Sequence, residues 1–152
     1  MLSRREVLRN GLALSAMSAL PAGEAFSALH LRLAAGIVDA NLPAAARMAE
    51  RFRRESAALH VFAGDPGRLW MSVIEPALRR RPEAIAGFTG AATLFCFQYL
   101  AQGYGLGLAA RAAGPAALDR LDVAEPDLLD LRDPRLADAD TVVTWILAPK
   151  RG

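Results

Sequence analysis

Polar residues follow three short apolar runs of the sequence, at the points where each run gives way to a helical pattern. The residues that could do chemistry here are Asp39, Asn41, Asp65, Arg68, Thr89, Gly90 and Thr93. Ligands of open parallel sheets bind beyond the carboxyl ends of the strands, so we expect these residues to share one edge of a sheet. Their chemistry is either the binding of a small anion or acid–base catalysis by an aspartate.

The segment from Gly87 to Thr93 is the best candidate for anion binding. Small and hydroxyl residues stand here at the start of a predicted helix, where unpaired N–H groups and the positive dipole end favour a carboxylate or phosphate. The spacing matches neither the dinucleotide fingerprint nor the P-loop. The alternative, which we favour, is that Thr89 caps the helix and that Gly87 and Gly90 serve the turn.

The second loop offers Asp65 as a general acid or base and Arg68 as a partner for an acidic ligand. An aspartate followed by proline and glycine is also ordinary capping chemistry, and we favour that interpretation. No serine occupies a Gly-x-Ser-x-Gly elbow and neither histidine lies in these loops, so a triad hydrolase is not predicted. An enzyme would have to use Asp39, Asp65 and Thr89, in a transferase or hydrolase-like reaction.

Residues suited to metal or redox chemistry are few: one cysteine, Cys96, and two histidines, His30 and His60. Cys96 falls within the most apolar predicted helix, where we expect a buried and inert thiol. The histidines belong to alternating stretches, and we expect them to be solvated on a sheet face. We therefore predict no metal site and no bound cofactor. A single cysteine also excludes a disulfide within the chain.

Three regions typical of an export signal follow one another at the N-terminus. Ser3-Arg4-Arg5-Glu6-Val7-Leu8-Arg9 precedes the apolar stretch 11–20, which is far shorter than the roughly 20 residues that cross a bilayer. Gly23-Glu24-Ala25 then provides the small residues that signal peptidase requires. We predict cleavage after Ala25, with the bond after Ser27 as second choice. The alternative interpretation is an amphipathic surface helix.

This N-terminal segment resembles the twin-arginine signal family, in which the Arg pair is followed by a variable residue, two apolar positions and often a basic one. Val7 stands where the family most often has Phe, and Arg9 where it often has Lys. The resemblance implies that the twin-arginine translocase recognises Arg4 and Arg5 and exports the folded chain to the periplasm. It often implies a cofactor or partner acquired in the cytoplasm. We expect no stable membrane anchor after cleavage.

Length and charge allow one small domain. The chain has 152 residues, 53% of them hydrophobic, so a signal peptide of residues 1–25 leaves a single domain of residues 26–152. The formal net charge of +2 becomes +1 on cleavage, because three arginines and two glutamates are removed. This nearly neutral domain lacks a basic stripe interleaved with aromatic residues, and we expect no nucleic-acid partner.

Short apolar runs alternate with helical patterns in the rest of the chain, which is typical of βαβ units. The predicted strands are 29–34, 58–63, 84–88, 106–110 and 141–147, and the predicted helices are about 42–56, 66–81 and 91–102. Pro76 should kink or divide the second helix. The third helix is apolar almost all round and should be the most buried. Residues 114–140, acidic and rich in proline, predict an irregular segment.

These elements predict an α/β fold, a three-layer sandwich with a mostly parallel sheet of four to five strands. The layout resembles that of small exported α/β proteins of proteobacteria that have no assigned function. Our leading hypothesis is a non-enzymatic periplasmic accessory protein that binds a partner protein or a small anionic ligand. Service to a redox enzyme that shares the export route is a third possibility, which rests only on the signal. The alternative is a small enzyme. An enzyme needs a concave pocket where polar side chains converge, whereas an accessory protein should expose an apolar patch or a flat surface.

Overall fold

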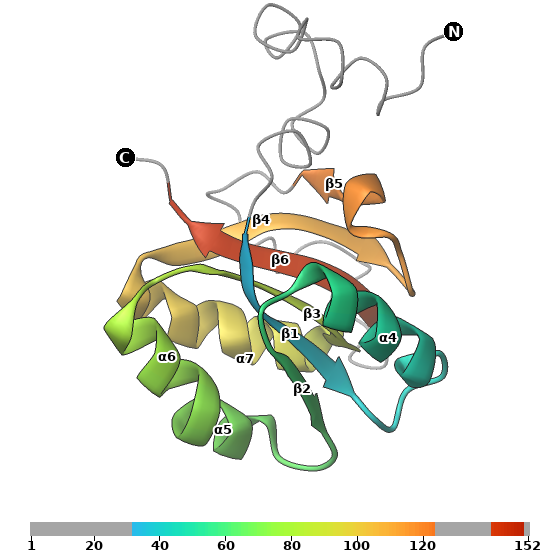
Figure 1. Cartoon of the computed structure of the whole chain (residues 1–152), viewed down its shortest axis with the longest axis horizontal. Helices are drawn as coiled ribbons and strands as arrows, with labels where there is room; N and C mark the ends of the chain where they lie inside the picture. The colour runs from blue at the N-terminus through green and yellow to red at the C-terminus, as the bar shows by residue number, and fades with distance from the viewer. Residues whose placement is uncertain (1–31, 124–140, 151–152) are drawn as a thin grey trace, which may run out of the picture.

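The computed structural model describes residues 32–123 and 141–150. Over these residues the chain forms one six-stranded sheet in the order β2-β1-β3-β6-β4-β5 (Figure 1). The strands are β1 (Leu33–Asp39), β2 (Leu59–Phe62), β3 (Ala84–Gly90), β4 (Leu106–Ala113), β5 (Asp122–Val123) and β6 (Val142–Pro149). The helices are α4 (Ala45–Glu55), α5 (Pro66–Leu69), α6 (Glu75–Arg80) and α7 (Ala91–Ala101), with a π-helical segment at Trp70–Ile74 and 3-10 turns at Gln102–Tyr104 and Leu118–Arg120.

Several predictions concern residues outside these ranges. They include the signal peptide with Arg4, Arg5 and its cleavage site, and also His30. Residues 124–140 of the predicted acidic segment are outside as well. Within 32–123 and 141–150, none of the helices combines the length and the hydropathy that crossing a bilayer requires.

The sheet is mixed, so the prediction of a mostly parallel sheet was wrong. β1 is parallel to both β2 and β3, whereas β6 is antiparallel to β3 and to β4, and β4 is antiparallel to β5. β4 therefore runs in the same direction as β3, and β6 is inserted between them in the opposite direction. Antiparallel pairing needs no crossover helix, and the apolar residues of a buried strand do not record its direction. The alternation of apolar runs and helical patterns in the sequence therefore could not predict that β6 lies between β3 and β4.

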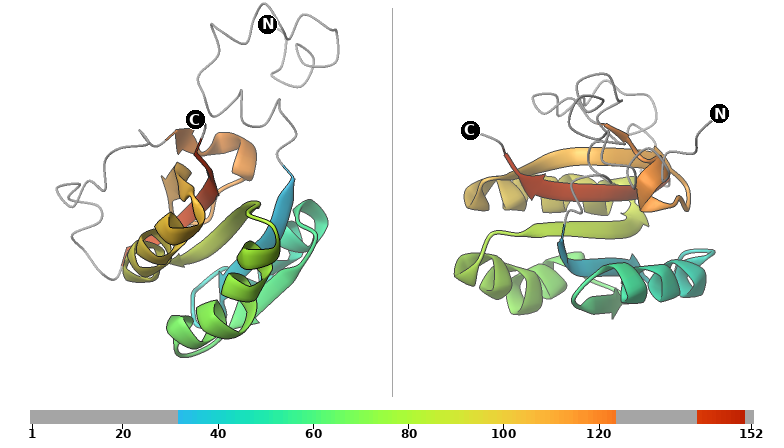
Figure 2. Two further views of the ribbon diagram at one scale, coloured as in Figure 1. Left: turned by 90° about the vertical axis from the view of Figure 1, so that its left-hand side faces the viewer. Right: turned by 45° about the horizontal axis from the view of Figure 1, so that its top comes forward.

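Apolar side chains cover both faces of the sheet. Successive residues of β1 point to opposite faces, so Ile37 belongs to one buried cluster and Val38 to the other. The first cluster includes residues of the π-helical segment, α6 and α7, among them Trp70 and Phe97. The second includes Phe52 of α4. Figure 2 shows α4 on one side of the sheet and the other helices on the opposite side.

The first strand begins later than predicted, because β1 occupies Leu33–Asp39 rather than 29–34. Much of the predicted loop 35–41 is therefore strand. A strand with parallel neighbours on both sides and helices over both faces corresponds to a continuous apolar run in the sequence. The strand was predicted too early because alternating apolar and polar residues precede this run. Gly36 lies within the strand because α4 crosses it closely. A Cβ at Gly36 would stand 2.5 Å from the Cβ of Phe52.

The second helix is divided as Pro76 predicts. α5 passes into the π-helical segment, whose last bond joins the N–H of Glu75 to the carbonyl of Trp70, and α6 begins beside the proline. Pro76 has no N–H to donate, so one backbone bond of a regular helix is missing here. The wider π turn places both Trp70 and Ile74 in the core.

The other elements match their predictions within a few residues. β2, β3, α4, α7, β4 and β6 overlap the predicted strands and helices. The described part of the segment 114–140 contains only a short 3-10 turn and the two residues of β5.

Candidate functional site

The carboxyl ends of β1, β2 and β3 lie at one rim of the sheet. Asp39 at the end of β1 is paired in register with Phe62 at the end of β2, and Val38 with Phe88 of β3. All three strands run in the same direction, so the segments that follow them start from the same edge (Figure 1). The parallel arrangement that the candidate site requires is therefore present. The atomic contacts at this rim determine what its residues can do.

The two aspartates of the rim bind backbone groups of their own loops. A carboxylate oxygen of Asp39 accepts a hydrogen bond from the N–H of Asn41 at 3.0 Å. Asp65 is the N-cap of α5 and accepts from the N–H of Gly67 at 2.8 Å, which confirms the capping interpretation. Both carboxylates thus stabilise local turns. Arg68 follows on α5 with its side chain exposed.

Thr89 is fully buried in the sheet and does not cap a helix. Its Oγ1 accepts a hydrogen bond from Nε1–H of Trp145 at 3.0 Å, and its hydroxyl donates to the carbonyl of Gly90 at 2.9 Å. The capping interpretation was wrong because β3 extends to Gly90, which is itself the N-cap of α7 and has no side chain to bond. A ligand at the rim could not reach the Thr89 hydroxyl without displacing the core.

Gly87 also has a role that the sequence did not predict. It lies inside β3, opposite Trp145 of β6, and not in the turn. A Cβ at this position would stand 2.0 Å from Cζ2 of Trp145. The indole ring therefore occupies the space above the glycine, and only glycine permits this packing.

The N-terminus of α7 is partly occupied by β6. The N–H of Ala91, the first residue of the helix, donates to the carbonyl of Thr141 at 2.7 Å. This contact exists because Gly90 is paired with Val142, so the chain entering β6 passes beside the helix start. An anion at this end of α7 would have one fewer N–H group to bind, because the N–H of Ala91 is already bonded. Thr93 lies within the first turn of the helix and is half-buried.

The candidate residues do not form one interacting group. Among residues 32–123 and 141–150, no hydrogen bond or ion pair joins a candidate side chain of one loop to that of another. The same part of the chain contains no group of three or more histidine, cysteine, aspartate or glutamate side chains arranged to hold a metal ion. The loops start from one rim of the sheet, but Asp39, Asp65 and Thr89 form hydrogen bonds with nearby backbone groups and not with one another.

A polar cluster at the other end of the helices was also missed by sequence reasoning. The hydroxyl of Tyr104 donates to the carboxylate of Glu75 on α6, and Nη2 of Arg79 donates to the same carboxylate at 3.1 Å. The Tyr104 hydroxyl bond, together with the hydrogen bond and charge of Arg79, lowers the pKa of Glu75. The cluster ties α6 to the turn after α7. Only the Glu75–Arg79 spacing of four residues could have been found in the sequence.

The most unusual surface belongs to α7. Its outward side chains are Ala92, Phe95, Cys96, Tyr99 and Leu100, which we call the α7 outer face. Phe95, Tyr99 and Leu100 keep 43%, 67% and 37% of their surface exposed, and Cys96 is exposed as well. The helix contains no charged residue. Surface helices normally present polar residues to water, so this apolar face is an exception.

This exposure corrects two expectations. α7 was predicted to be the most buried helix, and Cys96 was predicted to be a core thiol. The inner side of α7 is indeed buried through Leu94 and Phe97, but the helix covers the sheet with one side only. An apolar sequence all round a helix indicates burial only when a second surface covers it. The sequence shows that α7 is apolar on all sides, and this feature was interpreted as evidence of complete burial.

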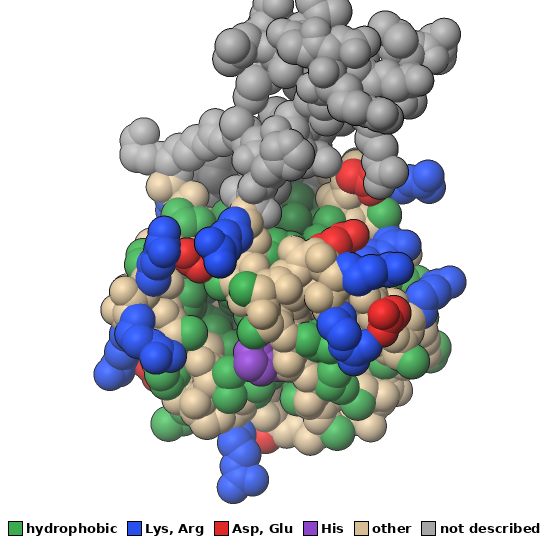
Figure 3. Space-filling model, viewed as in Figure 1, with side chains coloured by type: hydrophobic (Ala, Val, Ile, Leu, Met, Phe, Trp, Pro, Cys, Tyr) green, Lys and Arg blue, Asp and Glu red, His purple; other side chains and the backbone are tan. Residues whose placement is uncertain are grey.

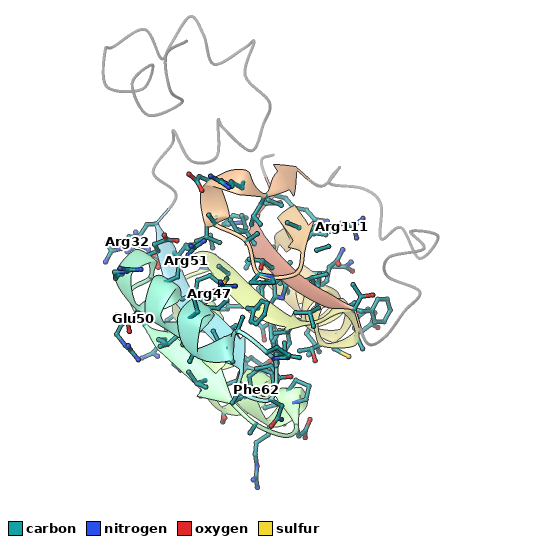
Figure 4. All side chains as sticks on the ribbon, turned by 90° about the vertical axis from the view of Figure 1, so that its right-hand side faces the viewer. Arg32, Arg47, Glu50, Arg51, Phe62 and Arg111 are labelled. Atoms are coloured by element: carbon teal, nitrogen blue, oxygen red, sulfur yellow. The ribbon has the colours of Figure 1, made fainter. Side chains whose placement is uncertain are left out.

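Charged side chains lie instead around α4 and, on the other side of the sheet, at Arg68 of α5 and Arg79 and Arg80 of α6. Figure 4 shows Arg32, Arg47 and Arg51 around α4, whereas Arg111 lies apart on β4. Glu50 forms an ion pair with Arg53 on the same helix. These groups are exposed or half-buried and solvated.

Comparisons with protein-family models, with curated proteins and with solved structures found no match for this chain.

Proposed function

We propose that this chain is a non-enzymatic accessory protein of the bacterial periplasm that binds a partner protein through the α7 outer face. The observation that carries the proposal is the exposure of Phe95, Tyr99 and Leu100 on a helix without charged residues. Contiguous apolar surface on a soluble domain marks interaction sites, because leaving it in water costs free energy that a partner recovers.

The arrangement of layers is part of the proposal. We infer a three-layer sandwich in which α4 is one outer layer and α5 to α7 the other. The inner side of α7 packs on β3, β4 and β6, and its outer side then forms the surface of the molecule. The partner would be a protein with an apolar groove or helix of its own, since the α7 outer face offers few polar groups for a small polar ligand.

Export through the twin-arginine pathway is proposed from the sequence. The support is the Arg4-Arg5 pair followed by the apolar stretch 11–20 and the small residues before Ala25. A chain with a single cysteine needs no oxidising compartment to complete its fold, which is consistent with folding before export. The translocase is therefore the first proposed partner, and the protein that covers the α7 outer face is the second.

The rim of the sheet supports catalysis or anion binding less well than α7 supports protein binding. Asp39 and Asp65 accept hydrogen bonds from their own loops, and Thr89 is buried. An anion at the start of α7 would compete with the carbonyl of Thr141 for the N–H of Ala91. We therefore propose that Asp39, Asp65, Thr89 and Gly90 have structural roles.

Site-specific photo-crosslinking in cells tests the proposed surface. A photoreactive phenylalanine analogue is placed at Tyr99, and as a control at Arg53, which is exposed on α4. We expect a discrete crosslinked protein from position 99 and none from position 53. Adding Leu100→Glu to the first chain should abolish the adduct without changing the thermal midpoint. Equal adducts from both positions, or none from either, would contradict the proposal.

Cell fractionation tests the export proposal separately. The wild-type chain should accumulate in the periplasmic fraction as a shortened form. Replacing both Arg4 and Arg5 by Lys should leave the full-length chain in the cytoplasm. Periplasmic accumulation of the double variant at the wild-type level would show that a different route is used.

A further inference from the structure

The two edges of the sheet are built differently. Within the described residues, which end at Val123 here, β5 is two residues long, and a very short edge strand is a poor template for further pairing. β2 has four residues, and the stretch from Ala57 to Gly64 around it contains no proline and no Asp, Glu, Lys or Arg. Natural edge strands usually carry a lysine, a proline or a bulge that prevents pairing with another chain. The β2 edge has none of these.

The backbone of β2 presents alternate groups to solvent. The carbonyls of Ala58 and Phe62 accept hydrogen bonds from the N–H groups of Gly36 in β1 and of Ala40 just after it, both at 2.8 Å. Residues of a strand alternate between its two neighbours, so the N–H and C=O groups of Leu59 and Val61 point away from β1. Nothing in the described part of the chain is hydrogen-bonded to them.

The side chains of β2 leave apolar surface at this edge. Leu59 and Val61 lie on the face that α4 covers, but α4 packs mainly on β1, and Val61 remains 52% exposed. His60 is paired with Ile37 and points to the opposite face together with Phe62. Figure 3 shows the histidine bordered by hydrophobic side chains, with the charged ones further away.

We propose that two copies of this chain associate through their β2 edges as antiparallel strands about a twofold axis. The pairing places His60 opposite His60 of the second copy. Leu59 of each copy then exchanges hydrogen bonds with Val61 of the other, which satisfies every outward backbone group of these two residues. The result is one sheet that continues through both copies.

A second copy is the occupant that this edge fits best, because the strand is complementary to itself. The twofold pairing sets each exposed Val61 beside Leu59 of the other copy on the α4 face, so identical apolar pairs cover each other. At the centre, the two imidazoles are neighbours. Burial lowers the pKa of His60, so both rings are neutral at pH 7 and do not repel each other.

The charged groups of β1 and α4 do not interfere with the proposed pair of His60 side chains. On β1, Asp39 lies on the same face two residues beyond Ile37 and is engaged with the N–H of Asn41. The charged residues of α4 lie on the opposite face of the sheet, with Leu59 and Val61.

Light scattering and sedimentation of the purified mature chain test the association. We expect a dimer for the wild type and at least a tenfold higher dissociation constant for Val61→Lys. The control Tyr99→Lys, a lysine on the α7 outer face, should remain a dimer. Urea unfolding of each variant monitors the fold. A wild type that stays monomeric at every concentration would overturn the proposal, and so would a dimer lost in Tyr99→Lys but retained in Val61→Lys.

Cysteine crosslinking tests the register in a background in which Cys96 is replaced by Ser. His60→Cys should oxidise to a covalent dimer, because residues at a non-hydrogen-bonded antiparallel position are close enough for a disulfide. Val61→Cys is the matched control, since Val61 faces Leu59 and not itself. Crosslinking of neither variant, or equal crosslinking of both, would overturn the proposed pairing.

Discussion

Trp145 of β6 and Thr89 of β3 are joined by a hydrogen bond of 3.0 Å from indole Nε1–H to Oγ1, and both side chains are fully buried. The bond fixes the indole above Gly87 and in edge contact with Phe97 of α7, with ring centroids 6.0 Å apart. One threonine hydroxyl therefore orients the aromatic core between the inserted strand and α7.

Replacing Thr89 by Val should destabilise the protein, because the valine keeps the shape but leaves the indole N–H without a partner. We expect a loss of about 1–3 kcal/mol in the free energy of unfolding. Thr89→Ser keeps the hydroxyl and should lose only the contribution of one buried methyl group, about 1 kcal/mol. Urea unfolding measures both. Equal losses in the two variants would show that the hydrogen bond is unimportant.

Gly87→Ala should be among the most damaging single substitutions in the chain. The new Cβ would stand 2.0 Å from Cζ2 of Trp145, so the buried indole or the strand must move. We expect a cost of about 3 kcal/mol or more. Gly103→Ala is the control, because a Cβ there has no atom within 4 Å, and its effect should stay within about 0.5 kcal/mol. Thermal unfolding compares the two, and similar midpoints would refute the close packing of Gly87.

Tyr104→Phe should raise the pKa of Glu75 toward its ordinary value, because the Tyr104 hydroxyl bond is the first cause of the lowered pKa. A carboxyl with a lowered folded pKa stabilises the protein above its unfolded pKa, and this contribution is lost as the pH falls through the folded pKa. The variant should therefore be less stable than the wild type at pH 7, and the difference should shrink below about pH 4. NMR titration of the Glu75 carboxyl measures the pKa. An unchanged value in the variant would contradict the assignment.

Cys96 should react with a thiol reagent in the folded protein, because it lies on the exposed α7 outer face. We expect complete modification of one thiol per chain without denaturant, and none in Cys96→Ser. A partner bound to the α7 outer face should slow the reaction. Modification that requires denaturant would show that the thiol is covered.

Local chemistry made several elements predictable. The Asp65-Pro66-Gly67 sequence predicted an N-cap, and Asp65 caps α5 through the N–H of Gly67. Pro76 predicted the division of the second helix, which occurs through a π-helical segment. These features depend on residues that are neighbours in the chain, so the sequence contains all the information they require.

Pairings between distant residues were not predictable in the same way. Thr89 was interpreted as a cap because the position of β6, which supplies Trp145, cannot be derived from the residues around Thr89. β1 was placed too early because a polar alternation preceded the buried run. Cys96 was assigned to the core because an apolar helix does not record which of its sides is covered.

The amino-acid sequence by itself determined the alternation of strands and helices, the Asp65 cap and the interruption at Pro76, because hydrophobic period, proline and capping residues act within a few positions of the chain. Tertiary structure alone decided the mixed direction of the sheet, the burial of Thr89, the exposure of the α7 outer face and the open edge of β2. Each of these depends on which segments become neighbours in space, and that choice is made by the packing of the whole core.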